Sequence, residues 1–252
     1  MLNPLDLTGR TVVVTGASRG IGRAAAVYLS QLGARVVAVA RDEQKLDETL
    51  GNLAGSGHLS RSFDLNQVDQ LPALLKKLSE ETGPLYGLVH SAGIVFNRPL
   101  KGLTHQSLLD IQRINVDAAI MLSKGFRQKG VADPAGSSIV YLSSVAAFKT
   151  KPALAAYAAT KGALLSLAKT LALELAPEKI RVNCVCPGLV RTAMLEDLEQ
   201  ILLPEQIEKL HAEYPLGLGE PEDVAYAIAF LLAPAGRWIT GTSVVLDGGY
   251  TA

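Results

Sequence analysis

The sequence predicts an α/β fold, a doubly wound parallel sheet of about seven strands with helices on both faces. Short runs of β-branched residues alternate with longer helical patterns, as expected when crossover helices join parallel strands. The first run, Thr11-Val12-Val13-Val14, is apolar without alternation, which is typical of a strand covered on both faces. The 252 residues show no break in composition, so we expect a single domain spanning 1–252.

Seven runs are expected to be strands, because they are short, rich in β-branched residues and separated by helical patterns. In chain order they are 11–15, 34–40, 58–64, 85–90, 138–143, 180–187 and 243–247. Helices are expected in the intervals, where apolar residues recur with helical spacing. They are 21–32, 43–53, 67–82, 104–125, 153–175 and 222–232, with a further helical segment of mixed polarity at 192–214.

Composition argues against several classes of function. The 24 basic and 24 acidic residues give a formal net charge of zero, which does not indicate a nucleic-acid partner. The apolar runs are shorter than the roughly 20 residues of a membrane span, and the N-terminus lacks the apolar core of a signal peptide. We therefore expect a cytoplasmic protein without a membrane partner. Cys184 and Cys186 would share one face of a strand, and we interpret them as buried thiols rather than metal ligands.

A glycine-rich turn follows the first predicted strand and reads Thr15-Gly16-Ala17-Ser18-Arg19-Gly20-Ile21-Gly22. Its glycines allow a tight turn and a close approach to a pyrophosphate, and the next helix would present its N-terminal amides to the phosphates. The spacing is G-x-x-x-G-x-G rather than G-x-G-x-x-G. A turn of this kind can need glycine for geometry alone, but its place in an α/β chain favours dinucleotide binding.

The end of the second predicted strand indicates the choice of cofactor. A site that prefers NAD carries an acidic residue there, which binds the ribose 2′-hydroxyl. Here the strand ends Ala38-Val39-Ala40-Arg41, and the planar guanidinium of Arg41 can pair with a 2′-phosphate. Arg19 is a second candidate, and the two arginines favour NADP(H). Against this, Asp42 follows directly, and Arg41 could simply begin an exposed helix.

Tyr157 and Lys161 are the candidates for proton transfer. They lie four residues apart in a helix-forming run, so they share one face a single turn apart. A positive charge beside a tyrosine favours the phenolate, and we expect the pKa of Tyr157 to fall from about 10 toward the working range. Such a phenol can exchange a proton with a substrate oxygen. The alternative is a surface pair on an amphipathic helix.

Together these features resemble the short-chain dehydrogenase/reductase family, which has a Rossmann-type fold. The resemblance covers Thr11 to Gly249 and rests on motifs that occur in order and at set separations. They are the turn 15–22, Asp64-Leu65, Asn115, Ser144 thirteen residues before Tyr157, the Y-x-x-x-K of Tyr157 and Lys161, and Pro187-Gly188 followed by Thr192. One motif departs, because His90-Ser91-Ala92-Gly93 stands where the family usually has Asn-Asn-Ala-Gly. The small Ala92 and Gly93 still let the backbone pass close to a cofactor.

The resemblance implies a role for each site residue. Ser144 would hydrogen-bond the substrate carbonyl, Tyr157 would donate the proton, and Lys161 would lower the tyrosine pKa and hold the nicotinamide ribose. Asn115 would support a water that links Lys161 to a proton relay. No metal is expected. The cofactor would contact Gly16, Ser18, Arg19, Gly20, Ile21, Gly22, Arg41, Asp64, Leu65, Ser91, Ala92, Gly93, Tyr157, Lys161, Pro187, Gly188, Val190 and Thr192.

Three residues keep an alternative interpretation. Ser143 is adjacent to Ser144 and could be the true partner of Tyr157. Asn115 could be a structural amide that kinks its helix. His90 is attractive as a catalytic base, but a packed or hydrogen-bonded histidine is more typical of a strand end.

The segment 189–214 should form the substrate lid in this family. Its apolar residues suit an acyl chain or another hydrophobic ketone, although a core-packing helix would look similar. They are Leu189, Val190, Met194, Leu195, Leu198, Ile201, Leu202 and Leu203. The C-terminal stretch, 219–224 with 239–241 and 247–249, most closely resembles 3-oxoacyl-[acyl-carrier-protein] reductases. An acidic carrier protein would need basic residues near the mouth, for which Arg127, Lys129 and Lys179 are candidates.

Three functions therefore remain open. The first is NADPH-dependent reduction of a ketone, with 3-oxoacyl thioesters as the leading substrates. The second is a reductase or dehydrogenase of free small or hydrophobic ketones and secondary alcohols. The third is a non-catalytic dinucleotide-binding sensor. The helix at 153–175 is apolar almost all round, which indicates subunit packing and fits the tetramer that is common in the family.

Overall fold

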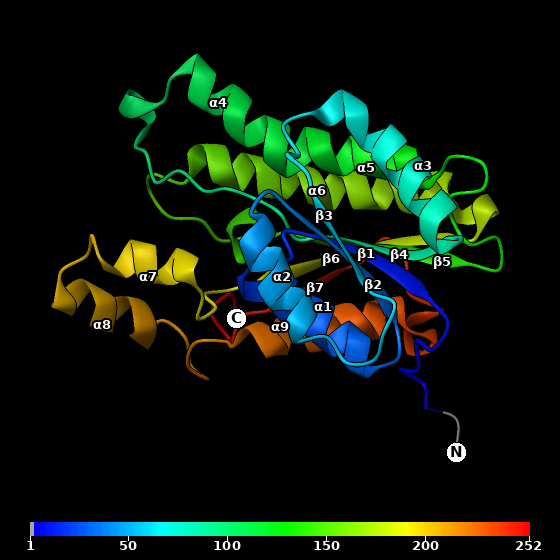
Figure 1. The fold of residues 1–252 in the computed structure, drawn as a ribbon. Helices are drawn as coiled ribbons and strands as arrows, with labels where there is room; N and C mark the ends of the chain where they lie inside the picture. Colours follow the sequence, from blue (N-terminus) through cyan, green and yellow to red (C-terminus); the bar gives the residue numbers. More distant parts are fainter. Residues whose placement is uncertain (1–2) are drawn as a thin grey trace.

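Seven parallel strands form the centre of the computed structural model, which describes residues 3–252 (Figure 1). They lie in the order β3-β2-β1-β4-β5-β6-β7, and every neighbouring pair is parallel. The predicted α/β class is confirmed. The strands are β1 Thr11–Thr15, β2 Arg35–Ala40, β3 Leu59–Ser62, β4 Leu85–His90, β5 Ser137–Leu142, β6 Ile180–Pro187 and β7 Ser243–Leu246.

Helices cover both faces of the sheet (Figure 1). Val13 of β1 belongs to a core built with α3, α5 and α6, whereas Val12 and Val14 belong to a second core built with α1 and α9. Successive side chains of a strand point to opposite faces, so an uninterrupted apolar run serves two cores. The helices are α1 Gly20–Gln31, α2 Glu43–Gly51, α3 Leu71–Thr82, α4 His105–Gln112, α5 Ala118–Phe126, α6 Ala155–Glu174, α7 Ala193–Glu199, α8 Pro204–Ala212 and α9 Pro221–Leu232.

Two expected helices are each divided in the structure. The run 104–125 contains a π-helical segment, η3 (Arg113–Asp117), between α4 and α5. The run 192–214 forms α7 and α8, because Pro204 begins a new helix. Single 3₁₀ turns connect other elements, and they are η1 Val68–Gln70, η2 Leu100–Gly102, η4 Val145–Ala147, η5 Ala176–Glu178 and η6 Pro234–Gly236.

The expected third strand is also shorter than 58–64. β3 lies at the edge of the sheet and pairs only with β2, so its ends gain no second partner. Beyond it, the Asp64 carboxylate accepts a hydrogen bond from the Asn66 backbone at 3.0 Å and turns the chain. Asp64 is therefore placed in a loop that follows the sheet.

The sheet changes its direction of winding between β1 and β4. From β1 the chain adds β2 and β3 on one side, then returns to place β4 on the other side of β1. The loops after β1 and β4 consequently diverge at one edge of the sheet, which is where open α/β sheets bind ligands. At the same edge α7 and α8 project beyond the strands (Figure 1).

The structure also shows where the two cysteines lie and whether the described residues could form a membrane span or a metal site. Cys184 and Cys186 are both fully buried on the α6 side of β6, as predicted. Within residues 3–252 no helix is long and apolar enough to cross a membrane. In the same range no three side chains of His, Cys, Asp or Glu are grouped so that they could hold a metal ion.

Candidate active site

One cavity of about 600 Å³ lies at the carboxyl ends of the strands. The glycine-rich turn after β1 lines it, together with Ser91, Ala92 and Gly93 after β4. The loop after β5, the first turns of α6 and the segment after β6 complete the wall. All of the predicted site residues line this cavity except Asn115.

The glycine-rich turn leaves room for a ligand because the backbones around it are packed too closely for side chains. Gly16 has φ +69°, and a Cβ there would lie 2.8 Å from the Ala92 amide nitrogen. A Cβ at Gly22 would overlap the Gly16 carbonyl oxygen. α1 begins at Gly20 with no acidic residue in its first turn, so its positive end faces the cavity unopposed. This cradle fits the pyrophosphate of a dinucleotide.

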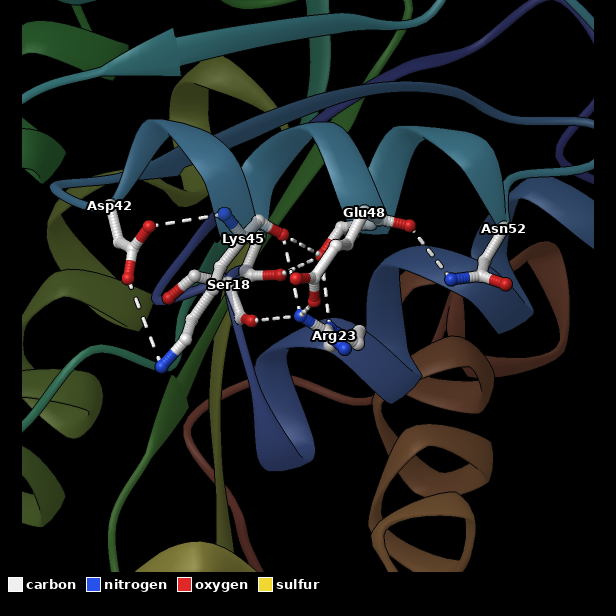
Figure 2. A network of polar contacts seen from close by, with 8 residues as sticks. Ser18, Arg23, Asp42, Lys45, Glu48 and Asn52 are labelled. Atoms are coloured by element: carbon white, nitrogen blue, oxygen red, sulfur yellow. Dashed lines mark hydrogen bonds and ion pairs between the residues drawn. The ribbon is translucent and has the colours of Figure 1, made fainter.

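Helix α2 packs against the turn and holds it in place (Figure 2). Arg23 donates to the Ser18 carbonyl oxygen at 2.6 Å and pairs with Glu48 at 3.0 Å. Thr49 donates to the Ala17 carbonyl oxygen at 2.9 Å. These bonds join α1 and α2 to the turn, so its amides are fixed before any ligand arrives.

Two arginine side chains line the cavity, Arg41 directly after β2 and Arg19 in the glycine-rich turn. Arg19 and Arg41 are exposed, both line the cavity, and neither makes an ion pair within residues 3–252. The Asp42 carboxylate instead caps α2 by accepting from the Lys45 backbone at 3.1 Å (Figure 2). Its second oxygen lies 3.8 Å from the Lys45 ammonium. Asp42 is therefore engaged by α2, and the residues present fit a 2′-phosphate better than a free 2′-hydroxyl.

Tyr157 and Lys161 lie one turn apart on α6 and both line the cavity. The Lys161 ammonium is 5.5 Å from the centre of the Tyr157 ring and donates to the Leu142 carbonyl oxygen at 2.7 Å. Lys161 is only 4% exposed. The interpretation of this pair as an exposed surface pair is therefore wrong.

The expected lowering of the Tyr157 pKa is also wrong for this structure. Burial raises the pKa of Tyr157, and the Ser144 hydroxyl only partly opposes this rise. Burial also lowers the pKa of Lys161 to about 8, so the cost of desolvation governs both groups. A phenol with a raised pKa keeps its proton at neutral pH and is suited to donate it.

The structure separates the two neighbouring serines. Ser143 is buried, and its hydroxyl donates to the Lys161 carbonyl oxygen at 2.8 Å. Ser144 caps the 3₁₀ turn η4, where its hydroxyl oxygen accepts from the Ala146 amide at 3.2 Å. Ser144 also lines the cavity, where its hydroxyl is the hydrogen-bond partner that opposes the rise in the pKa of Tyr157 caused by burial. The geometry favours Ser144 over Ser143.

Asn115 lies behind the cavity wall in η3 and is fully buried. Its amide accepts from the Ile94 backbone at 2.9 Å, and donates to the Ile94 carbonyl and the Thr160 hydroxyl, both at 3.0 Å. It thus ties the loop after β4 to α6. A Cβ at Gly93 would lie 3.2 Å from the Asn115 carbonyl oxygen and 3.4 Å from the Lys161 ammonium.

His90 does not line the cavity. It is 1% exposed, and its Nδ1 lies 3.0 Å from the Thr15 hydroxyl. Burial, followed by the charge of Lys161, lowers the pKa of His90 to about 3, so the ring is neutral near pH 7. These facts favour a packed, hydrogen-bonded histidine that joins β4 to β1 over a catalytic base.

The segment after β6 closes the cavity on the side away from β2. Gly188 packs against Tyr214, and a Cβ there would lie 2.7 Å from the tyrosine ring. The Thr192 side chain packs against Gly20, so this segment touches the glycine-rich turn. Of the apolar residues expected in the lid, the cavity is lined by Leu189, Val190, Met194, Leu195 and Leu198. Ile201 and Leu203 are 72% and 66% exposed and contribute nothing to it.

Sequence reasoning missed many lining residues, and those with polar side chains include Lys45, Asn97, Lys149, Lys151, Tyr214 and Tyr250. Lys149 and Lys151 are close to Ser144 in sequence, and that proximity was the signal that could have identified them. Tyr214 and Tyr250 carry no such signal, because they reach the cavity only through the packing of the lid and the C-terminus. Their rings stack with centres 4.8 Å apart.

The predicted carrier-protein contacts are contradicted. Arg127, Lys129 and Lys179 do not line the cavity but surround a separate hollow next to the start of β6, at the opposite edge of the sheet. Arg127 is also already paired with Glu178 at 2.7 Å and Glu174 at 3.7 Å. The positions of isolated basic residues in the sequence do not show at which edge of the sheet their side chains lie, which is why this prediction failed.

Residues 16–251 match the family model described as enoyl-(acyl carrier protein) reductase. Among known proteins, a tropinone reductase homolog from Arabidopsis thaliana is 35% identical over 98% of this chain and 94% of its own length. The 3-oxoacyl-[acyl-carrier-protein] reductase of Vibrio cholerae is 32% identical over 97% of this chain and 98% of its own length.

Solved structures agree in fold. A short-chain dehydrogenase/reductase from Brucella melitensis has a TM-score of 0.89 at 34% identity and covers 98% of both chains. A Beutenbergia cavernae structure with bound NADP has the same TM-score at 32% identity, over 98% of this chain and 99% of that one. A 3-ketoacyl-(acyl-carrier-protein) reductase from Brucella melitensis, complexed with NADH, has a TM-score of 0.87 at 29% identity and covers 98% and 100%.

Proposed function

The chain belongs to the short-chain dehydrogenase/reductase family, whose members bind NAD(P)(H), and on this premise we propose that it is an NADPH-dependent reductase of ketones. The observation that carries the proposal is the single cavity that Ser144, Tyr157 and Lys161 share with the glycine-rich turn. The alternative function, a sensor that only binds a dinucleotide, does not account for the buried Lys161 next to Tyr157 in this cavity.

Each residue has one task in this proposal. The reduced nicotinamide supplies hydride when it is bound. The Ser144 hydroxyl donates a hydrogen bond to the substrate carbonyl oxygen and orients it. The Tyr157 hydroxyl, which holds its proton because burial raises its pKa, gives that proton to the same oxygen. The Lys161 ammonium stabilises the negative charge left on Tyr157, and Asn115 holds the backbone around it.

We propose NADPH rather than NADH as the reductant. Arg19 and Arg41 are available to a 2′-phosphate, and the Asp42 carboxylate is engaged by α2. A planar guanidinium matches phosphate geometry, whereas an acidic residue free to bind the 2′-hydroxyl would favour NADH.

Two substrate classes have support. The 3-oxoacyl thioesters are supported by the reductases of that class among the relatives and by the apolar lid. Free hydrophobic ketones are supported equally by the tropinone reductase homologs. The proposed lid, 189–214, would close over either substrate. The cytoplasmic location expected from the sequence stays a prediction.

A carbonyl panel tests the proposal. The loss of NADPH absorbance is followed with acetoacetyl thioester, a free aryl ketone, and crotonyl thioester, in which a C=C bond replaces the ketone. Oxidation of NADPH with either carbonyl compound supports a ketone reductase, and their relative rates decide between the two classes. Turnover of crotonyl thioester alone, or of none of the three by folded protein, contradicts it.

A further inference from the structure

The substrate half of the cavity is positively charged. Lys149, Lys151 and Lys161 line it on the side of Ser144 and Tyr157. Asp42 and Asp64 are the two carboxylates that line the cavity within residues 3–252, and they follow β2 and β3 on the other side of the winding switch. No Asp or Glu in the described chain therefore lines the part where a substrate would lie.

Two of the three lysines are already engaged. Lys161 donates to the Leu142 carbonyl behind Tyr157. Lys151 pairs with Glu213, which follows α8, at 2.7 Å. The Glu213 carboxylate therefore balances the positive charge of Lys151. The pair also joins the loop after β5 to the end of the lid segment.

Lys149, like Lys161, has no carboxylate of residues 3–252 within ion-pair distance, but unlike the buried Lys161 its side chain is exposed. Its ammonium donates to the Tyr250 carbonyl oxygen at 2.6 Å and stands 4.3 Å from the centre of the Tyr250 ring. Tyr250 is buried and stacks on Tyr214, so this pair of rings holds Lys149 in place. An ammonium makes three hydrogen bonds, and only one is used here.

We propose that Lys149 binds an anionic group of the substrate, and that the natural substrate is a ketone with a carboxylate a short distance from its carbonyl. This assignment rests on the proposed ketone reductase. Lys149 is five residues from Ser144 in the same loop and lines the same cavity as Ser144 and Tyr157, so we expect the anion to bind near the reacting carbonyl. The phosphates of coenzyme A or of a carrier arm are separated from a 3-oxo group by a long chain, and we expect them outside this pocket.

The test uses matched pairs of acids and esters. The values of kcat/KM are measured with NADPH for 3-oxobutanoate, 4-oxopentanoate and 5-oxohexanoate, each beside its neutral methyl ester. The wild type should prefer the best acid over its ester by tenfold or more. The preference should fall to near one in Lys149→Met and persist in Lys149→Arg. Lys77→Met, an exposed lysine of α3 away from the cavity, is the control and should keep the preference.

A binding measurement separates this inference from the proposed function. Calorimetry with the unreactive pentanoate and methyl pentanoate reports the same preference without turnover, so it still decides if no ketone is reduced. The inference is overturned if acid and ester behave alike in the wild type, or if Lys149→Met keeps the preference. It is also overturned if Lys149→Met instead affects acetoacetyl-coenzyme A relative to the neutral N-acetylcysteamine thioester, because that result assigns the lysine to a phosphate.

Discussion

At the scale of single residues, desolvation rather than charge pairing sets the chemistry of Tyr157 and Lys161. The Lys161 ammonium donates its hydrogen bond to the Leu142 carbonyl oxygen and lies 5.5 Å from the centre of the tyrosine ring. The burial of a phenolate therefore raises the pKa of the phenol more than the electrostatic attraction of the ammonium lowers it. A protonated tyrosine suits the proposed reduction, in which a proton must be given to the substrate.

Arg41 should decide between the two nicotinamide cofactors. We expect Arg41→Asp to raise KM for NADPH by about ten- to a hundredfold, because a charge-assisted hydrogen bond contributes about 1.5–3 kcal/mol. KM for NADH should change less, which a steady-state comparison of the two cofactors measures. Arg237→Asp, at an exposed position beyond α9, is the matched control. An unchanged ratio of the two KM values would remove Arg41 from the site.

His90 should make the fold sensitive to acid. Its pKa is about 3 in the folded protein and about 6.5 when unfolded, so between these values the unfolded chain binds more protons. Stability should therefore fall as the pH drops through this window, by up to about 1.4 kcal/mol per pH unit. In His90→Asn this contribution should vanish, which urea unfolding between pH 4 and 7 measures. Identical pH slopes for the two proteins would show that His90 does not titrate in this way.

At the scale of elements, the sequence was sufficient for β1, β4 and β6, whose observed bounds equal the predicted ones. Those strands are almost entirely buried and lie inside the sheet, so one local pattern determines them. The π-helical segment η3 was not predictable, because the bonds that Asn115 makes to Ile94 and Thr160 are tertiary. Similarly, Tyr250 reaches the cavity through a contact with Lys149 that spans 101 residues.

The glycine-rich turn depends on the absence of a side chain at Gly22. We expect Gly22→Ala to weaken NADPH binding at least tenfold and to lower the free energy of unfolding by about 1–3 kcal/mol, because the new methyl group overlaps the Gly16 carbonyl. Fluorescence titration with NADPH and chemical unfolding measure the two effects. In Gly51→Ala, at the end of α2 with open space around it, both values should stay near those of the wild type. Normal NADPH affinity in Gly22→Ala would contradict the proposed cradle.

At the scale of the whole molecule, α6 carries the candidate catalytic pair on one side and exposes Leu173, beside the polar Lys169 and Thr170, on another. Its buried residues form one stripe that includes Thr160, Leu164 and Ala168, whereas Leu173 is 81% exposed. We propose that this surface packs against other copies in a homotetramer. Light scattering should give about four times the 26.6 kDa of one chain, and the mass of a single chain would contradict the proposal.

The sheet topology brings these parts together. Because the winding reverses between β1 and β4, the glycine-rich turn and the loop that Asn115 anchors border one cavity at the same edge, and α6 adds Tyr157 to its wall. The class of the fold followed from the sequence, and every predicted site residue except Asn115 lines the cavity. The positive charge of the substrate half of the cavity could not be predicted, because it depends on the tertiary positions of the acidic residues, which the fold places away from that half.

The most direct test of the central claim is single-turnover reduction by Tyr157→Phe, measured beside the NADPH dissociation constant of the same variant. The substitution removes one hydroxyl and keeps the ring, so cofactor affinity should stay within about threefold of the wild type. The rate of ketone reduction should fall by about 10²–10⁴-fold, the usual contribution of a positioned general acid. A variant that binds NADPH normally and reduces ketones at the wild-type rate would contradict the assignment of Tyr157 as the proton donor.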